Sequence, residues 1–591
     1  MAPTPSEIAR AYHATTKHHP QRYARALGYM DWDTQPDPFR RFPGAAEVAL
    51  PFSDEACTLS HAAAARGELE SGPVADLAPP ARLGRMLELC LGLTAWKQFE
   101  TNRWALRANP SSGNLHPTEG YVIVPGGHAG LPAGVLHYAP AEHALELRCS
   151  LPADAAAALA ELLPPGGFLV GLSSILWREA WKYGERALRY CCLDTGHALA
   201  AIDQAAACVG WQVTPLPGWT DADLAKLFGT DRTEDFADVD AWEREHPDLL
   251  LCVWPSAAGP AASSEAPGLD PDATLAALAP GTWHGRANSL SADHHEWDVI
   301  QATAASTKRV TRTGGAACEG KAAVLPTRDS SSLACTDQAL DQLLRQRRSA
   351  QSMRTKDALS LPAFLATLDA TLPRPDVAPW RAQDEGPDVD LLLFVHQVEG
   401  LERGLYLLER GVEHAPGLRE ALGPNLTWER PAALDLGAGA GHSGDGADGS
   451  DNADNADGAK TAAPYAHLRL HRLRSGHAES LARATSCNQD IAADGNFAVA
   501  MIARFGANVD ADPSRYRRLF WECGVIGQVL YIEAEAAGLR GTGIGCYFDD
   551  AVHQVLGLRG EEYQVLYHFT TGEPVDDDRL QTHPPYAHLE R

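Results

Sequence analysis

The chain contains 591 residues, more than one hydrophobic core normally serves, so two or more domains are expected. Its 50 Lys and Arg against 77 Asp and Glu give a formal charge of −27, which would repel nucleic-acid phosphates and anionic lipid. Residues 1–25 lack the apolar core of a secretory signal, and no apolar run approaches the roughly 20 residues that span a bilayer. Twelve cysteines without a CxxC pair are typical of reduced thiols. The sequence therefore predicts a cytoplasmic protein that binds neither nucleic acid nor membrane.

Two β-strands are predicted at 121–124 and 134–138, joined by a glycine-containing loop, because both segments are rich in β-branched and aliphatic residues. The same pair returns at 391–394 and 404–408, again with thirteen residues between the strand starts. One shared interval can arise by chance, so further matches are needed to indicate a repeat.

Helical runs with a shared fourteen-residue interval between glycines are predicted in both halves, from Gly196 to Gly210 and from Gly524 to Gly538. Another glycine follows nineteen residues beyond each run, and closing strands are predicted at 249–254 and 563–569. Three shared intervals indicate an internal duplication. Helices interspersed with a few strands are typical of an α+β layer fold, used here twice.

Three segments are predicted to be loops. Residues 431–463 repeat Gly, Ala, Asp and Asn with almost no apolar bulk, which predicts a disordered insertion. Residues 255–268 and 312–335 are rich in small residues, and the natural boundary falls between them. We therefore divide the chain into a first half, 1–260, an inter-domain segment, 261–335, and a second half, 336–591.

The sharpest motif is RANPSSGNLHPTE at 107–119. Pro110 fixes a backbone dihedral, and Gly113 allows the backbone to approach a flat ligand closely. Hydroxyl and amide groups that can pair with the rim of a heterocycle come from Ser111, Ser112 and Asn114. The alternative is a helix N-terminus capped by serine.

Two further motifs lie in the second half. The run RQRRSAQ contains Arg347 and Ser349, whose guanidinium and hydroxyl suit a phosphate monoester, although such a run can also be a solvated helix face. The run GTGIGCYFD lacks the spacing of a dinucleotide-binding fingerprint, so Gly543 and Gly545 are expected to let backbone amides face a ring system. No histidine or cysteine spacing predicts a metal site.

Together these motifs resemble the nitroreductase superfamily, and more narrowly its SagB- and ThcOx-type dehydrogenases, the azoline oxidases of peptide natural-product maturation. The resemblance covers nearly the whole chain. Its most specific part is WREAWKYGER at 177–186, supported by residues 12–19 and by the PPY segment at 584–586. It implies an α+β fold of two tandem nitroreductase-like domains that form an intramolecular pseudo-dimer.

In that superfamily two subunits share each FMN: one gives an Arg-x-Ser phosphate clamp, a Gly-rich loop and a C-terminal basic residue, and the other gives the Pro-Ser-Ser stretch. Here the parts are divided between the halves, because neither motif recurs at the repeat offset of 270. The resemblance therefore implies one FMN per chain, held by Pro110, Ser111, Ser112, Gly113, Asn114, Arg347, Ser349, Gln489, Gly543, Gly545 and Arg579.

Lys182 and Tyr183 match the pair to which the azoline oxidases assign acid/base work. Making an azoline aromatic removes a proton and a hydride, so a base is needed beside the flavin, and a desolvated Lys or a neighbouring Tyr could serve. The alternative is helical ion pairing, since Glu179 lies one turn before Tyr183 and Glu185 one turn before Arg189.

The leading functional hypothesis is thus an FMN-dependent dehydrogenase of an azoline or a related substrate, small or peptide-borne, acting as a pseudo-dimeric monomer or a higher homo-oligomer. A biosynthetic cyclodehydratase would be its partner enzyme. Two alternatives remain open. One is an NAD(P)H-dependent nitro or quinone reductase, which needs the same flavin without the base. The other is a flavin-free scaffold that recognises a substrate for other enzymes.

Overall fold

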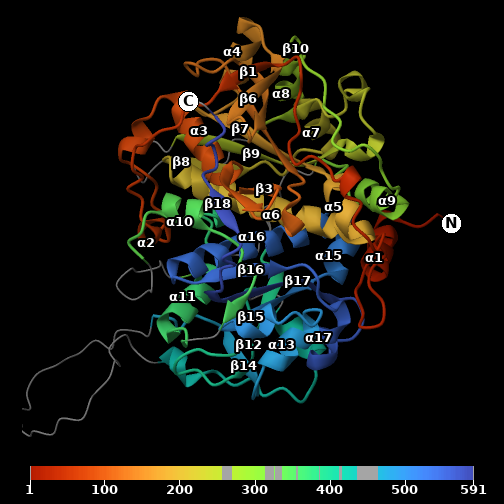
Figure 1. Ribbon diagram of the computed structural model, residues 1–591, viewed down its shortest axis with the longest axis vertical. Coiled ribbons are helices and arrows are strands. Elements are labelled where there is room, and N and C mark those ends of the chain that lie inside the picture. The colour runs from red at the N-terminus through yellow and green to blue at the C-terminus, as the bar shows by residue number, and fades with distance from the viewer. Residues whose placement is uncertain are drawn as a thin grey trace, which may run out of the picture.

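The computed structural model describes residues 2–255, 269–312, 325, 336–354, 357–384, 386–411, 415–435 and 464–589. It has the mixed α+β architecture that was predicted. Figure 1 shows one antiparallel sheet above and a second below, with two long helices between them. Over these described ranges, no helix combines the length and apolarity needed to cross a membrane.

The two sheets are built from strands of the first and second half, respectively. The first has the order β1-β6-β5-β4-β7-β9-β8 with β10 beside β6, comprising β1 Ala46–Ala49, β4 Thr118–Val124, β5 Gly134–Ala139, β6 Ala144–Ser150, β7 Phe168–Ile175, β8 Trp211–Pro215, β9 Glu245–Pro255 and β10 Thr282–Trp283. The second has the order β11-β17-β15-β12-β13-β14 with β16 beside β17, comprising β11 Met353–Arg354, β12 Val389–Val395, β13 Gly404–Leu408, β14 Leu470–Ser475, β15 Phe497–Arg504, β16 Arg540–Ile544 and β17 Tyr563–Pro574.

Apart from the short strands β1, β10 and β11, the two sheets have the same strand order. The sequence β6-β5-β4-β7-β9-β8 in the first corresponds to β14-β13-β12-β15-β17-β16 in the second. The predicted antiparallel pairs are confirmed, β4 with β5 and β12 with β13. Register shifts also fall at matching repeat positions, after Val135 and Leu405 and after Leu172 and Met501.

Helices α6 (Ala187–Ala207) and α16 (Arg515–Ala536) lie between the sheets and pack against each other (Figure 1). A Cβ atom on Gly196 would lie 2.1 Å from the carbonyl oxygen of Trp521, and one on Gly524 would lie 2.3 Å from that of Leu193. The prediction that helices start at these glycines was wrong, because both helices begin nine residues earlier. The glycines instead permit a close helix crossing.

Glycines follow the C-terminal ends of four helices, and at Gly210 and Gly538 this was predicted. Gly229 and Gly557 cap α7 (Asp221–Phe228) and α17 (Asp549–Leu556) in the left-handed conformation, each with φ of 72°. Gly210 and Gly538, just past α6 and α16, have φ of 73° and 71°. Glycine suits these places because a side chain is disfavoured at positive φ.

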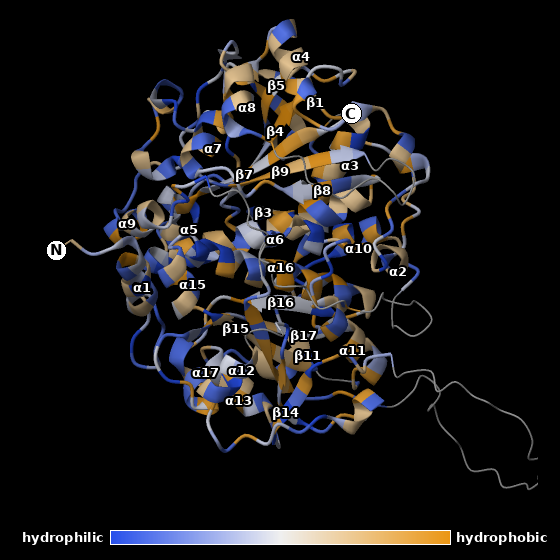
Figure 2. Cartoon of the chain, turned by 180° about the vertical axis from the view of Figure 1, so that it is seen from behind, coloured by the Kyte–Doolittle hydropathy of each residue, from blue (hydrophilic) through white to orange (hydrophobic). Residues whose placement is uncertain are grey.

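The main hydrophobic core is shared by the two halves. It runs from Val122 and Leu199 of the first half to Val395 and Ile526 of the second. Separate clusters cover the outer sheet faces, with β4 residues alternating between the two sides. Figure 2 shows apolar residues concentrated in α16 and in the strands.

The other helices are α1 Pro5–Thr15, α2 His61–Ala64, α3 Pro79–Cys90, α4 Ala153–Glu161, α5 Leu176–Tyr183, α8 Pro271–Leu278, α9 Asp298–Ser306, α10 Leu340–Gln346, α11 Leu361–Ala370, α12 Ala415–Ala421, α13 Glu479–Thr485, α14 Ile491–Asp494 and α15 Gly506–Ala511.

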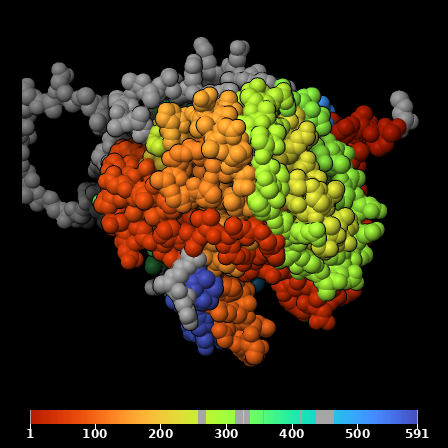
Figure 3. Space-filling model, turned by 90° about the horizontal axis from the view of Figure 1, so that it is seen from above, coloured from red at the N-terminus to blue at the C-terminus, as the bar shows by residue number. Residues whose placement is uncertain are grey.

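Each terminus packs on the opposite half. In α1, Arg10 pairs with Asp510 at 2.6 Å. At the other end, β18 (Gln581–His583) joins β2 (Leu93–Phe99) and β3 (Asn102–Arg107) in a third sheet. Figure 3 shows the C-terminal residues in blue alongside the orange β2–β3 hairpin. The simple boundaries 1–260 and 336–591 therefore miss an exchange of terminal segments.

The predicted inter-domain segment, 261–335, is largely part of the first half where it is described. Helices α8 and α9 belong to it, and β10 pairs with β6. The loop prediction at 255–268 lies outside the described residues except at Pro255, as does nearly all of 312–335 and the insertion from residue 436 to 463.

Candidate active site between the two halves

A cavity of about 790 Å³ is lined by residues of both halves. Pro110, Ser111 and Asn114 come from the first half, and Arg347 and Ser349 come from the second. Its wall carries five cationic side chains, Lys97, Arg107, Arg347, Arg348 and Arg540, and three acidic ones, Asp576, Asp577 and Asp578. The lining is thus net positive in a chain of charge −27, which favours an anionic ligand.

The loop after β3 has an unusual backbone. Gly113 and Asn114 both have φ of 60°, and His116 has φ of 53°. Non-glycine residues at positive φ are strained and cluster at functional sites. The capped-helix alternative is not seen, because the Ser111 hydroxyl accepts a hydrogen bond from the His116 N–H at 2.8 Å, outside the short turn Ser112–Asn114.

Asp194 on α6 is hydrogen-bonded to this loop. Its carboxylate accepts hydrogen bonds from the backbone N–H and the hydroxyl of Ser112, both at 3.1 Å. Burial raises the pKa of Asp194 to about 7, although the hydrogen bonds from Ser111 and Ser112 oppose that rise. Ser112 therefore has an internal partner and does not line the cavity.

Two buried polar groups at the cavity are left with unused hydrogen-bonding atoms. Both side-chain amide atoms of Asn109 lack a partner, and so does Nδ1 of His116. Only 1% of Asn109 is exposed. Burial, reinforced by Arg107, keeps the pKa of His116 well below its usual range, so its ring is neutral. Unpaired buried amides are costly, and a ligand with polar edges would satisfy them.

Arg347 and Ser349 face the cavity but also have protein partners. Arg347 follows α10, is only 4% exposed, and donates to the carbonyl oxygens of Arg107 and Ala108 at 3.0 and 3.1 Å. The solvated-helix alternative is therefore wrong for Arg347. Ser349 shares a 2.8 Å hydrogen bond with the Tyr531 hydroxyl, which also accepts from the N–H of Gly543 at 3.0 Å.

Gly543 in β16 and Gly545 just after it do not line the cavity. A Cβ on Gly543 would lie 1.8 Å from the Tyr567 hydroxyl oxygen, and one on Gly545 would lie 2.3 Å from the Tyr190 ring. These glycines make room for aromatic side chains, and the expectation that their amides face a ring system stays a prediction. The carbonyl oxygen of Gly545 accepts from the Tyr190 hydroxyl at 3.1 Å.

The Lys-Tyr pair ends α5 beside the loop after β3. A Cβ on Gly113 would lie 2.5 Å from the Tyr183 hydroxyl oxygen and 3.0 Å from Nζ of Lys182. Neither residue lines the cavity. Burial, together with Glu179, holds the pKa of Tyr183 well above its usual range, so its phenol is a proton donor and not the base that was considered.

The helical ion-pair alternative for this segment fails. Glu185 pairs with Arg25 at 2.9 Å, and Arg189 pairs with Asp549 at 2.6 Å. Both carboxyl oxygens of the fully buried Glu179 lack a hydrogen-bond partner. Burial first, and the nearby Asp194 second, raise its pKa well above the usual range, so Glu179 is neutral.

Gln489 and Arg579 lie outside the cavity wall. The Gln489 side-chain amide donates to the carbonyl oxygens of Ser486 at 3.0 Å and Cys546 at 2.8 Å. Arg579 turns to solvent and pairs with Asp577 at 2.7 Å, with 74% of its side chain exposed. That Arg579 contacts a phosphate stays a prediction, because its guanidinium pairs here with Asp577 and not with the cavity.

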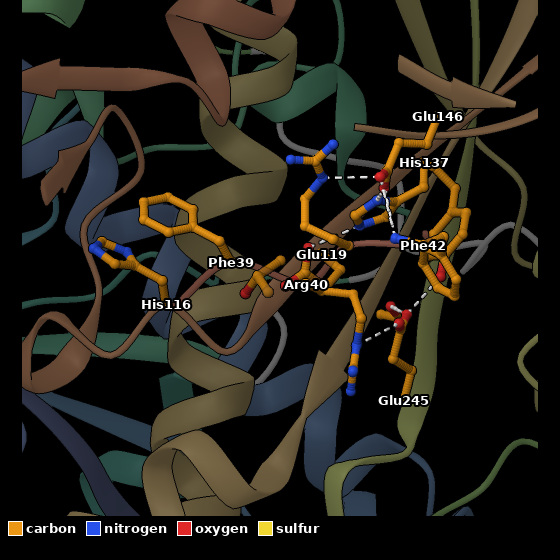
Figure 4. Close-up of polar contacts among 12 residues, drawn as sticks. Phe39, Arg40, Phe42, His116, Glu119, His137, Glu146 and Glu245 are labelled. Carbon is orange, nitrogen blue, oxygen red and sulfur yellow. Dashed lines mark hydrogen bonds and ion pairs between the residues drawn. The ribbon is translucent and has the colours of Figure 1, made fainter. Parts of the chain in front are cut away.

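A buried polar cluster lies on the first sheet next to the loop (Figure 4). His137 on β5 bonds to Glu119 at 3.0 Å and to Glu146 at 2.9 Å, and Arg178 pairs with Glu119. Although burial opposes it, the two carboxylates raise the pKa of His137 to about 9. Arg178 and His137 lower the pKa of Glu119 to about 2. The cluster thus fixes the strand that follows the loop.

Sequence reasoning missed Asn109, Asp194, Tyr531 and the acidic run 576–578. Asn109 could have been found, because it stands directly before Pro110 in the sharpest motif. Asp194 and Tyr531 lie on the two central helices and reach the site only through the helix crossing. No local pattern marks them.

Comparison with known proteins places part of the chain in a family. Residues 451–573 match the model of the Nitroreductase family. No curated protein matches the chain. The crystal structure of a candidate nitroreductase from Anabaena variabilis is similar over 96% of this chain and 99% of that one, with a TM-score of 0.63 and 20% identity.

Two other solved structures match smaller parts with low TM-scores. One is a candidate nitroreductase from Ralstonia eutropha, with 14% identity, a TM-score of 0.26 and coverage of 43% of this chain and 89% of that one. The other is the E. coli microcin synthetase McbBCD complex with truncated pro-MccB17 bound, with 15% identity, a TM-score of 0.25 and coverage of 39% and 70%. Residues 451–573 thus match a nitroreductase family model, and over most of its length the chain has the same α+β fold as the Anabaena variabilis structure.

Proposed function

We propose that this chain is an FMN-dependent oxidoreductase whose two halves act as an intramolecular pseudo-dimer with one flavin site. The observation that carries the proposal is the net-positive cavity of about 790 Å³, to which the loop after β3 and the segment around Arg347 both contribute. Its volume falls within the range of small-molecule and cofactor sites. The nitroreductase family match supports a flavin as the occupant.

The residues present fit such a cofactor. Arg347, Arg348 and Lys97 supply positive charge for the phosphate, and the unpaired amide of Asn109 can bond the edge of a polar ring. Arg579 has no part in this assignment. The three Asp residues 576–578 also line the cavity, and Arg540 pairs with Asp576 at 2.7 Å.

The region of the second half that corresponds, by the repeat, to the Ser111 loop offers no room for a second flavin. At the repeat offset, Arg381 stands where the first half has Ser111. Its guanidinium is bonded to the buried Asp203 at 2.7 Å. Cavities beside Trp380 and beside Gln383 measure only about 40 and 30 Å³, too small for a flavin. We therefore assign one FMN per chain.

We further propose that the substrate is an azoline or a related ring. Lys182 would accept the proton that this ring loses on oxidation. When bound, FMN supplies a two-electron acceptor. Lys182 lies against Gly113 of the loop, and the neutral Glu179 lies on the same helix. Tyr183 stays protonated and orients by hydrogen bonding, and its ring lies 5.3 Å from Nζ of Lys182.

An anaerobic experiment tests this function. The purified chain is loaded with FMN and mixed under nitrogen with a thiazoline peptide or with NADPH, and the flavin absorbance is followed. We expect the thiazoline to bleach the flavin and to yield a thiazole, and oxygen to restore the colour. Rapid bleaching by NADPH alone would instead identify a reductase. A protein that cannot be loaded with FMN would identify a flavin-free scaffold.

A further inference from the structure

Two cysteines differ from the others. Of the ten cysteines that the structure describes, eight are buried, whereas Cys487 and Cys546 are partly exposed. Cys487 lies between α13 and α14, and Cys546 lies two residues after the end of β16. Neither has a role in the proposed flavin site.

The segments that carry these cysteines run side by side. The N–H of Phe548 donates to the carbonyl oxygen of Thr485 at 2.8 Å, and the side chain of Gln489 donates to that of Cys546 at 2.8 Å. These bonds hold residues 485–489 against residues 546–548, and the Cys487 and Cys546 thiols lie close enough to influence each other's ionisation. Two thiols in contact across a paired loop can form a disulfide with little chain movement.

The first half activates one of the two thiols. Nδ1 of His18 accepts a hydrogen bond from the N–H of Ala24 at 2.9 Å, so the neutral ring carries its proton on Nε2 and can donate it to Cys546. Arg186 adds positive charge beside it and donates to the carbonyl oxygen of Gly545 at 3.3 Å. Such an electropositive, partly exposed environment is typical of reactive cysteines.

The pKa values agree with this geometry. The hydrogen bond from Cys487 is the main cause that lowers the pKa of the Cys546 thiol, and His18 and Arg186 lower it further against the effect of burial. The same hydrogen bond, followed by burial, raises the pKa of Cys487. Cys546 is thus the thiolate, and Cys487 is its protonated partner.

We propose that Cys546 and Cys487 form a redox-active dithiol that reacts with a low-molecular-weight disulfide of the glutathione type. The Cys546 thiolate attacks one sulfur of that disulfide, whose S–S bond breaks and releases one thiolate that takes up a proton. Cys487 then loses its proton and attacks the mixed disulfide at Cys546. A Cys487–Cys546 bond forms, and the second small thiol leaves. Two protein thiols are oxidised and one small disulfide is reduced.

The bond would couple the redox state of the small-thiol pool to the neighbourhood of the candidate site. It would fasten the loop that carries Gln489 to the end of the Gly-rich strand β16. Cys487 and Asn488, with φ of 53° and 59°, have a backbone conformation that non-glycine residues rarely adopt. The proposal does not depend on flavin binding.

Trapping with oxidised glutathione, followed by peptide mapping of the full chain, tests the proposal. In the parent protein we expect a Cys487–Cys546 cross-link. In Cys487→Ser we expect a glutathione adduct on Cys546, and in Cys546→Ser we expect neither product. Cys523→Ser, which removes a buried thiol, serves as the matched control and should behave like the parent. Circular dichroism spectra verify that each variant is folded.

A rate measurement gives a second, independent readout. At pH 7, iodoacetamide should alkylate Cys546 about tenfold faster than it alkylates free glutathione, because more of the thiol is ionised. His18→Gln should slow this alkylation while leaving the total number of thiols unchanged. Alkylation of Cys546 no faster than that of glutathione, or a Cys487→Ser variant without an adduct, would overturn the proposal.

Discussion

Nε of Arg347 donates a 3.1 Å hydrogen bond to the carbonyl oxygen of Ala108 and thereby joins a motif of the second half to a loop of the first. A second bond, from the same guanidinium to the carbonyl oxygen of Arg107, measures 3.0 Å. The two motifs are separated by more than two hundred residues in the chain. At the cavity they form one continuous wall.

Replacing Arg347 by Ala should weaken FMN retention. The variant loses a positive charge at the cavity and two hydrogen bonds to the loop, each charged bond being worth about 1.5–3 kcal/mol. We expect a ten- to hundredfold higher dissociation constant in a fluorescence titration. Arg345→Ala is the matched control, because Arg345 pairs with Glu88 and does not line the cavity. Equal FMN affinities of the two variants would contradict the role of Arg347.

Replacing Lys182 by Ala should leave the protein yellow but slow substrate oxidation by about 10²–10⁴, the usual contribution of a positioned acid or base. Tyr183→Phe should lose less, because its phenol stays protonated and serves for orientation. Single-turnover flavin reduction measures both. A Lys182→Ala variant that has lost its flavin, or that reacts at the parental rate, would rule out the assigned role.

Replacing Gly196 by Ala should destabilise the chain by about 1–3 kcal/mol, as overpacking a tight contact does. The added Cβ would lie 2.1 Å from the carbonyl oxygen of Trp521, so α6 and α16 must move apart. Ala157→Val adds volume on the exposed face of α4 and serves as the control. Urea denaturation measures both. Unchanged stability of Gly196→Ala would show that the helix crossing is loose.

His137 should make stability depend on alkaline pH. Its folded pKa of about 9 lies above the unfolded value of 6.5, so its ion pairs contribute below pH 6.5 and are lost as pH rises through 9. The contribution is about 3 kcal/mol. Urea denaturation of the parent and His137→Gln at pH 6 and pH 10 should therefore give a stability difference that shrinks with pH. A stability difference that is the same at pH 6 and pH 10 would contradict the raised pKa of His137.

Elements of the fold that depend on short stretches of sequence could be predicted from the sequence. The strand pairs that begin at 121 and 391 and the helix-ending glycines Gly210 and Gly538 could be predicted, because strand patterns and helix ends are properties of short segments. Gly196 was misread as a helix start for the same reason. Only the packing partner, Trp521 of α16, reveals that a glycine in mid-helix serves a close crossing.

The site was predicted only in part. Ser111 and Arg347 line one cavity, as predicted, because each belongs to a motif whose residue types indicate ligand binding. Arg579 does not, because Asp577, two residues away, binds its guanidinium in solvent. The pairing of Arg579 with Asp577 can be recognised only when the geometry of the turn between them is known. Asp194 could not be predicted, because its contact with Ser112 spans 82 residues.

A titration of the apo-protein with FMN, followed by flavin fluorescence quenching and by the absorbance of the bound fraction, tests the central claim most directly. One cavity is shared by the two halves, and Arg381 bonded to Asp203 fills the pseudo-equivalent place. We therefore predict a sharp endpoint at one FMN per chain. An endpoint at two equivalents, or no saturable binding, would contradict a single flavin site built between the halves.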